Sequence, residues 1–208
     1  MKNLGAWFLF VFAFSFQGLA EERSTSSVPA NMGLVYFMTV LDGVLYRGGS
    51  SNSSNHWKPL SIKQQSHLVS SGFTKSFFVK QNKKGAISSL EGLDYEYAFA
   101  YRQAEVNRVL AEVYQHIVDP SKGKVLVHCY GGWHASGLVA AMALIQFCGW
   151  SRESAVAYWE SHTAPKGRDP NIGGSSYNTE RSILRNFKYI PDLEISEADK
   201  ARVCQSAR

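Results

Sequence analysis

The chain has 208 residues, with 22 lysines and arginines against 17 acidic residues and a formal net charge of +5. The charges are interspersed along the sequence instead of forming blocks, which argues against the basic footprint of a nucleic-acid-binding protein. Its apolar content of 45% is ordinary for a globular protein. We expect one domain with a sizeable core and no nucleic-acid partner.

The first 20 residues have the features of a secretory signal peptide. Lys2 gives a positive start, Trp7 to Phe16 is almost entirely apolar, and residues 18–20 are small enough for a cleavage site. The apolar run is too short to span a bilayer comfortably, so we expect no stable membrane anchor after cleavage. The sequence thus predicts a signal peptide over 1–20, a flexible leader over 21–31, and export to the periplasm or outside the cell.

The remaining chain alternates between strand and helix patterns. The predicted elements, in chain order, are strands 33–41 and 44–46, helix 61–68, strands 73–79 and 93–99, helix 102–118, strand 124–128, and helices 135–147, 151–159 and 177–187. Helix 135–147 is apolar all round, which is typical of a helix buried in the middle of a domain. The alternation predicts an α/β sandwich with a central sheet over residues 32–190, followed by a polar tail over 191–208.

Three cysteines are too few for a disulfide framework. We expect Cys148, at the end of an apolar helix, to be buried as a small hydrophobic residue. Cys204 lies in the polar tail, where a free thiol or an intermolecular disulfide is expected. At least one thiol is left over, and an unpaired thiol in an oxidising compartment needs a reason.

The most informative segment runs from Val125 to Gly137. A buried strand ends at Cys129, and a glycine-rich loop then leads at once into the buried helix. The amide N–H groups of such a loop and the positive end of the helix dipole stabilise an anion, whether a phosphate or a thiolate. This environment also suits a cysteine that acts as a nucleophile.

Two segments resemble a known family. Val127-His128-Cys129, Gly131-Gly132 and Ser136-Gly137 resemble the His-Cys-x5-Arg-Ser/Thr-Gly signature of the protein tyrosine phosphatases, especially their dual-specificity branch. Tyr46-Arg47-Gly48-Gly49-Ser50 is similar to the opening Leu-Tyr-Arg-Gly element of that branch. The resemblance implies a three-layer α/β sandwich whose central sheet is mixed, mostly parallel and flanked by helices.

The resemblance also implies a role for each matching residue. Cys129 would attack phosphorus to form a cysteinyl-phosphate, His128 would order the loop, and Ser136 would help the thiolate leave. The loop would bind the phosphate oxygens through Tyr130, Gly131, Gly132, Trp133, His134, Ala135 and Gly137. A small phosphorylated substrate or a phosphoprotein is the implied partner, and no cofactor is implied.

One position departs from the family signature, because Ala135 stands where the family has arginine. An arginine there grips two phosphate oxygens with parallel charged hydrogen bonds, and losing such a donor typically costs about 3 to 4 kcal/mol. His134, Arg102 and Arg168 are the candidate replacements. The sequence leaves two functions open: an atypical phosphatase, or a catalytically impaired pseudophosphatase that binds phosphate or a phosphorylated partner through Cys129 to Gly137.

The family's second catalytic group is an aspartic acid that protonates the leaving oxygen. Asp94, which lies 35 residues before Cys129, is predicted for this role, with Glu91 and Glu96 as rivals. The alternative is that Asp94 is an ordinary carboxylate at the edge of a strand.

Two other chemistries use the same cysteine. A zinc site on His128, Cys129 and His134 is disfavoured because neighbouring side chains at a strand end point apart, and we predict no metal. A cysteine peptidase needs a histidine base, and nothing in the sequence positions the candidates, which are His67, His116 and His162.

Overall fold

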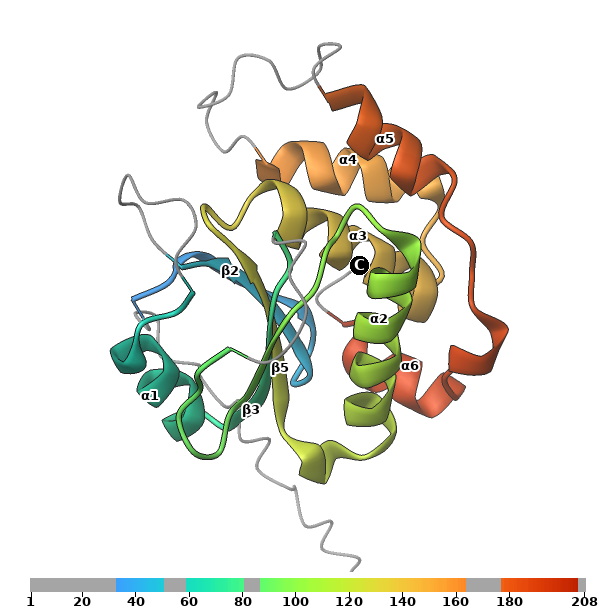
Figure 1. The fold of residues 1–208 in the computed structure, drawn as a ribbon. Helices are drawn as coiled ribbons and strands as arrows, with labels where there is room; N and C mark the ends of the chain where they lie inside the picture. Colours follow the sequence, from blue (N-terminus) through green and yellow to red (C-terminus); the bar gives the residue numbers. More distant parts are fainter. Residues whose placement is uncertain (1–32, 51–58, 81–86, 164–176, 206–208) are drawn as a thin grey trace, which may run out of the picture.

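The computed structural model describes residues 33–50, 59–80, 87–163 and 177–205. The predicted signal peptide and leader lie outside the described residues. A five-stranded sheet in the order β1-β2-β5-β3-β4 forms the centre, and helices cover both of its faces (Figure 1). The predicted three-layer α/β sandwich is confirmed.

The sheet is mixed and mostly parallel, as predicted. Its strands are β1 (Val35–Leu41), β2 (Leu45–Gly49), β3 (Phe73–Phe78), β4 (Asp94–Tyr97) and β5 (Lys124–Cys129). β1 and β2 form an antiparallel hairpin, whereas β2, β5, β3 and β4 run parallel. The carboxyl ends of the parallel strands therefore meet at one edge of the sheet, where open α/β sheets bind their ligands.

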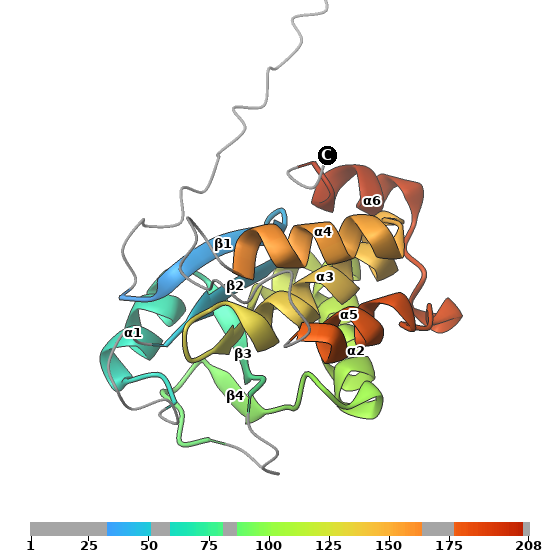
Figure 2. The same cartoon turned by 90° about the horizontal axis from the view of Figure 1, so that it is seen from above.

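The helices are α1 (Ile62–Ser70), α2 (Gln103–Val118), α3 (His134–Cys148), α4 (Arg152–Thr163), α5 (Asn178–Arg185) and α6 (Glu197–Val203). Ser61 caps α1 through a capping box with Gln64, so the predicted start of this helix is confirmed. α1 lies on one face of the sheet, and α2 and α3 lie on the other (Figure 2). In the described part of the chain, no helix combines the length and apolar character needed to cross a membrane.

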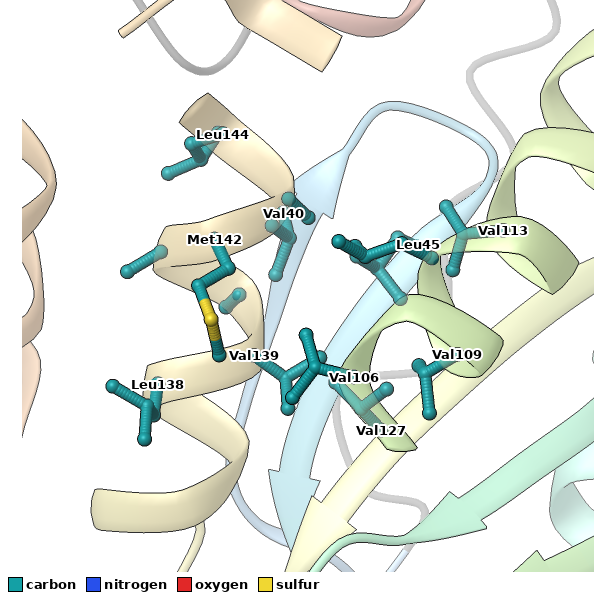
Figure 3. Packing of buried hydrophobic residues seen from close by; sticks show 14 of the residues in the cluster. Val40, Leu45, Val106, Val109, Val113, Val127, Leu138, Val139, Met142 and Leu144 are labelled. Carbon is teal, nitrogen blue, oxygen red and sulfur yellow. The ribbon is translucent and has the colours of Figure 1, made fainter. Parts of the chain in front are cut away.

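The larger core lies between the sheet and α2 and α3. Val127 of β5 meets Val106 of α2 and Val139 of α3 there (Figure 3). Every residue from Ala135 to Phe147 is buried, so α3 is the central helix that its all-round apolar sequence predicts. Because side chains alternate along a strand, β5 directs Cys129 to this helical face and His128 to the face that carries α1.

Within the predicted polar tail, residues 191–205 form η4 (Pro191–Leu193) and α6, and α6 packs onto the domain. Val203 of α6 is fully buried, and its carbonyl oxygen accepts a 2.8 Å hydrogen bond from the amide of Asp42. Cys204 forms a disulfide with Cys148, which also corrects the expectations for both cysteines. Sequence pattern missed the pair because its members are 56 residues apart and meet only when α6 folds back onto α2.

Candidate active site

Cys129 ends β5 at the edge of the sheet where the parallel strands finish. Its thiol is free, and only 5% of the residue is exposed. Its Sγ lies 3.3 Å from the Oγ of Ser136, in the first turn of α3. The structure thus brings the predicted nucleophile and the predicted hydroxyl partner into contact at the N-terminus of the central helix.

A buried arginine supports the loop between β5 and α3. Arg47 of β2 is fully buried, and its Nη2 donates to the carbonyl oxygens of Gly132 at 2.8 Å and Trp133 at 3.2 Å. In a trans peptide the C=O and N–H groups point in opposite directions. The next two amides, those of Trp133 and His134, are therefore directed away from Arg47, toward the other side of the loop. In the sequence Arg47 stands out only as part of a motif, and no pattern there indicates this role.

Glycines allow this loop to lie directly on the end of β2. A Cβ on Gly49 would lie 2.4 Å from the carbonyl carbon of Gly131, and one on Gly132 would lie 2.7 Å from the amide nitrogen of Gly49. Gly132 also has a φ of +76°, which other residues adopt with strain. Gly137 makes room for the guanidinium of Arg47, since a Cβ there would lie 3.0 Å from its Nη2. These glycines allow the loop to pack against β2 and Arg47. This geometry explains the position of the loop and does not by itself assign any of them to phosphate binding.

His128 joins a hydrogen-bonded chain behind the loop. The hydroxyl of Tyr95 accepts a 2.9 Å hydrogen bond from the amide of Leu60, so its own proton is left for Nε2 of His128. Nδ1 then carries the imidazole proton and donates to the carbonyl oxygen of Cys129 at 3.2 Å. Burial lowers the pKa of His128 to about 3, which keeps the ring neutral. The histidine thus orders the loop by holding the backbone of Cys129.

This buried histidine should make stability depend on pH. The unfolded chain protonates His128 near pH 6.5, whereas the folded protein excludes that proton until about pH 3. The free energy of unfolding should therefore fall as the pH drops below about 6.5, by up to about 1.4 kcal/mol per pH unit from this group. Urea unfolding between pH 5 and 7 measures the slope. His128→Asn should flatten it and His67→Gln should not; equal slopes in both would contradict the assignment.

The structure places Asp94, the predicted acid, away from Cys129. Asp94 and Val125 both pair with Lys75, so Asp94 is level with the start of β5. Cys129 lies four residues further along, or about 13 Å in the strand direction. Asp94 instead forms an ion pair with Lys75. Its rival Glu96 also binds Lys75, and Glu91 lies before β4, at the same far end of the sheet. Spacing along the chain did not reveal which end of the strand each carboxylate occupies.

A buried methyl group occupies the position where the phosphatase signature has arginine. Ala135 is fully buried and belongs to the same hydrophobic cluster as Cys129. The ring of His134 stacks on Tyr177, with 5.0 Å between ring centres. The guanidinium of Arg102 lies over the ring of Phe99. Both candidates for the missing cation therefore pack on aromatic rings. The third candidate, Arg168, lies outside the described residues.

Tyr101 and Glu180, which no sequence pattern indicates, lie on the side of the sheet that carries α2 and α3. Tyr101 follows β4, and its hydroxyl donates to Oε1 of Glu180 on α5 at 3.1 Å. The pKa of Tyr101 is raised, mainly by burial, then by Glu180 and to a smaller extent by the charge of Cys129. Tyr101 is therefore within electrostatic reach of the sulfur. No sequence motif marks the pair, because its members are 79 residues apart.

The remaining loop residues form an aromatic border. Trp133 packs over Gly131, and its ring makes an edge contact with Tyr36 at 5.1 Å between centres. Tyr36 has a φ of +49°, an uncommon conformation for a bulky residue, within an irregular stretch of β1. Tyr130, the first loop residue after β5, is half-buried.

No protein-family model matches the sequence, and no curated protein matches it. Among solved structures, Tk-PTP is 16% identical, with 72% of this chain and 94% of that one covered and a TM-score of 0.50. PTPMT1 is 13% identical, with coverage of 72% and 91% and a TM-score of 0.50. TpbA of P. aeruginosa is 20% identical over 78% and 91%, with a TM-score of 0.44. The chain has the fold of the cysteine-dependent tyrosine and dual-specificity phosphatases.

Proposed function

We propose that the protein is an atypical cysteine-dependent phosphatase that hydrolyses phosphate monoesters through a cysteinyl-phosphate on Cys129. The contact between Cys129 and Ser136 at the start of α3 carries this proposal. The N-terminus of a helix favours a negative charge on the sulfur and on a bound phosphate. A hydroxyl at 3.3 Å is placed to donate to the sulfur when the thiolate leaves.

The residues that hold the loop in place favour an active catalytic site over one that has lost its function. Arg47 holds two loop carbonyls, His128 holds the carbonyl of Cys129, and Gly49 gives the loop its seat. Donors that are fixed before the substrate arrives need no reorganisation as charge develops. The alanine at position 135, where the family has arginine, lowers the catalytic rate. The loss of one charge-stabilising donor typically lowers it by a factor of several hundred.

The decisive experiment compares the mature wild-type chain with Cys129→Ser on aryl phosphates and inositol phosphates between pH 5 and 8. Turnover by the wild type that falls to background in the variant is expected. Ser136→Ala is the matched variant for the second step: it should keep a burst of product release and then turn over more slowly. Equal rates in wild type and Cys129→Ser would refute the proposal.

A second candidate function is favoured by the burial of Ala135. A fully buried methyl group in the arginine position, packed into the core that contains Cys129, is also compatible with a pseudophosphatase. Such a protein would bind phosphate or a phosphorylated partner through the loop without turnover. Calorimetry of Cys129→Ser with inorganic phosphate tests it, and binding heat together with an inactive wild type is the expected signature.

We propose that the protein is exported and meets its phosphorylated substrate outside the cytoplasm. The disulfide between Cys148 and Cys204 supports this, since structural disulfides persist in oxidising compartments and are rare in the cytosol. The apolar segment at the start of the chain points the same way. A fusion of residues 1–30 to a reporter enzyme that is active only after export would check the localisation.

A further inference from the structure

We infer that Glu180 is the proton-transfer group of this site and that Tyr101 positions its carboxyl group. The assignment rests on the proposed phosphatase function and replaces the aspartic acid that Asp94 does not supply. Three observations support it. The backbone of Tyr101 lies at the same edge of the sheet as Cys129, the side chains of Tyr101 and Glu180 share a hydrogen bond, and α5 packs beside the start of α3.

Backbone hydrogen bonds place Tyr101 level with Cys129. The amide of Val79 donates to the carbonyl oxygen of His128 at 2.9 Å, and the amide of Ala100 donates to the carbonyl oxygen of Val79 at 3.0 Å. Ala100 and His128 thus flank Val79, roughly 10 Å apart across two strand spacings. Tyr101 and Cys129 are the next residues of their segments. Both therefore lie at the edge where the parallel strands end, whereas Asp94 lies at the opposite edge.

The hydroxyl of Tyr101 then fixes the carboxyl group. It donates to Oε1 of Glu180 at 3.1 Å, which leaves Oε2 for a transferable proton. Glu180 is only 8% exposed, so its orientation is set by the protein rather than by solvent. The electrostatic effect of Cys129 on Tyr101 supports the closeness of the Tyr101 hydroxyl to the sulfur.

The start of α5 lies beside the start of α3. Tyr177, the residue that precedes α5, stacks on His134, the first residue of α3. Glu180 lies one turn further along α5, which packs against α3 and α4 (Figure 2). Glu180 is thus fixed by the hydrogen bond from Tyr101 and lies on the helix whose preceding residue stacks on His134.

The charges around Glu180 leave its carboxyl group available for proton transfer. Its neighbour Arg181 forms an ion pair with Glu160, at 2.6 Å. Within the described ranges, the hydrogen bond that Glu180 accepts comes from the neutral Tyr101. Asp94 and Glu96, by contrast, both bind the ammonium group of Lys75. Within the described residues Glu180 has no ion pair, and such a carboxyl group can gain and lose a proton without breaking a charged contact.

The reaction then proceeds in two steps, in which Glu180 first gives up a proton and then regains one. In the first, the thiolate of Cys129 bonds to phosphorus, the ester P–O bond breaks, and the leaving oxygen takes the proton of the Glu180 carboxylic acid. In the second, a water oxygen bonds to phosphorus, its proton passes to the Glu180 carboxylate, and the S–P bond breaks to return the thiolate. Each turnover restores the proton and the thiolate.

The test compares Glu180→Gln, Tyr101→Phe and the matched control Asp94→Asn. Each is assayed on two phosphate esters, one whose leaving group needs a proton and one whose leaving group does not. On phenyl phosphate or an alkyl phosphate, Glu180→Gln should lower kcat/KM by at least about 100-fold. On 4-nitrophenyl phosphate, whose phenolate leaves without a proton, the loss should be much smaller. Tyr101→Phe should show the same bias more weakly, and Asp94→Asn should match the wild type on both substrates.

The outcomes separate this assignment from the proposed function. Equal losses of Glu180→Gln on both substrates, or losses no larger than those of Asp94→Asn, would overturn the assignment while Cys129-dependent turnover remained. A wild type without Cys129-dependent turnover would overturn both. Glu180→Asp guards against a folding artefact, because it keeps an acid and should retain more activity on phenyl phosphate than Glu180→Gln.

Discussion

Replacing Cys148 and Cys204 together with serine should lower the free energy of unfolding by about 4 kcal/mol. The disulfide closes a loop with a sequence separation of 56, and a cross-link of this size restricts the unfolded chain by about that amount. It also ties α6, which contributes the buried Val203, to the end of the central α3. Domains typically have a total stability of about 5 to 15 kcal/mol, so a loss of this size is a large fraction of it.

Denaturant unfolding with and without a reducing agent measures the effect. The reductant should destabilise the wild type and leave the double serine variant unchanged. Cys129→Ser is the matched control, because Cys129 is free and its replacement should preserve the sensitivity to reductant. A loss below about 1 kcal/mol in the double variant would show that α6 is held by its other contacts, such as the hydrogen bond between Asp42 and Val203.

Ala135→Arg should raise kcat/KM for aryl phosphates by a factor of several hundred. Ala135 directly precedes Ser136, whose hydroxyl contacts the sulfur of Cys129, so an arginine there starts next to the reacting atoms. A guanidinium binds two phosphate oxygens in parallel, and such a donor is worth about 3 to 4 kcal/mol in the transition state. Because Ala135 is fully buried, we also expect a loss of stability of about 1 to 3 kcal/mol from overpacking.

Two control variants separate the geometry of the cation from its charge and its size. Ala135→Lys brings a point charge without the planar fork and should gain far less than Ala135→Arg. Ala135→Met brings comparable length without charge and should gain nothing. A folded Ala135→Arg protein with no gain in rate, combined with phosphate binding, would favour the pseudophosphatase.

Local patterns in the sequence determined the elements and the centre of the site. The apolar run into Cys129 predicted β5, and the all-round apolar segment after it predicted the buried α3, because burial on every side leaves no polar face. The short contact between Cys129 and Ser136 also follows from local structure, since a strand, a tight loop and a first helical turn bring residues seven apart together. These features depend on neighbours along the chain.

Only the tertiary structure decided the partners that come from elsewhere in the chain. The register of β4 against β3 moved Asp94 away from the sulfur and brought Tyr101 to its level. The packing of α5 set Glu180 beside Tyr101, and the fold of α6 joined Cys204 to Cys148. Periodicity shows which face of an element is buried, but it carries no information on strand register or on which distant elements pack together. Those depend on how side chains fill the core between the elements, which is settled only when the whole chain is folded.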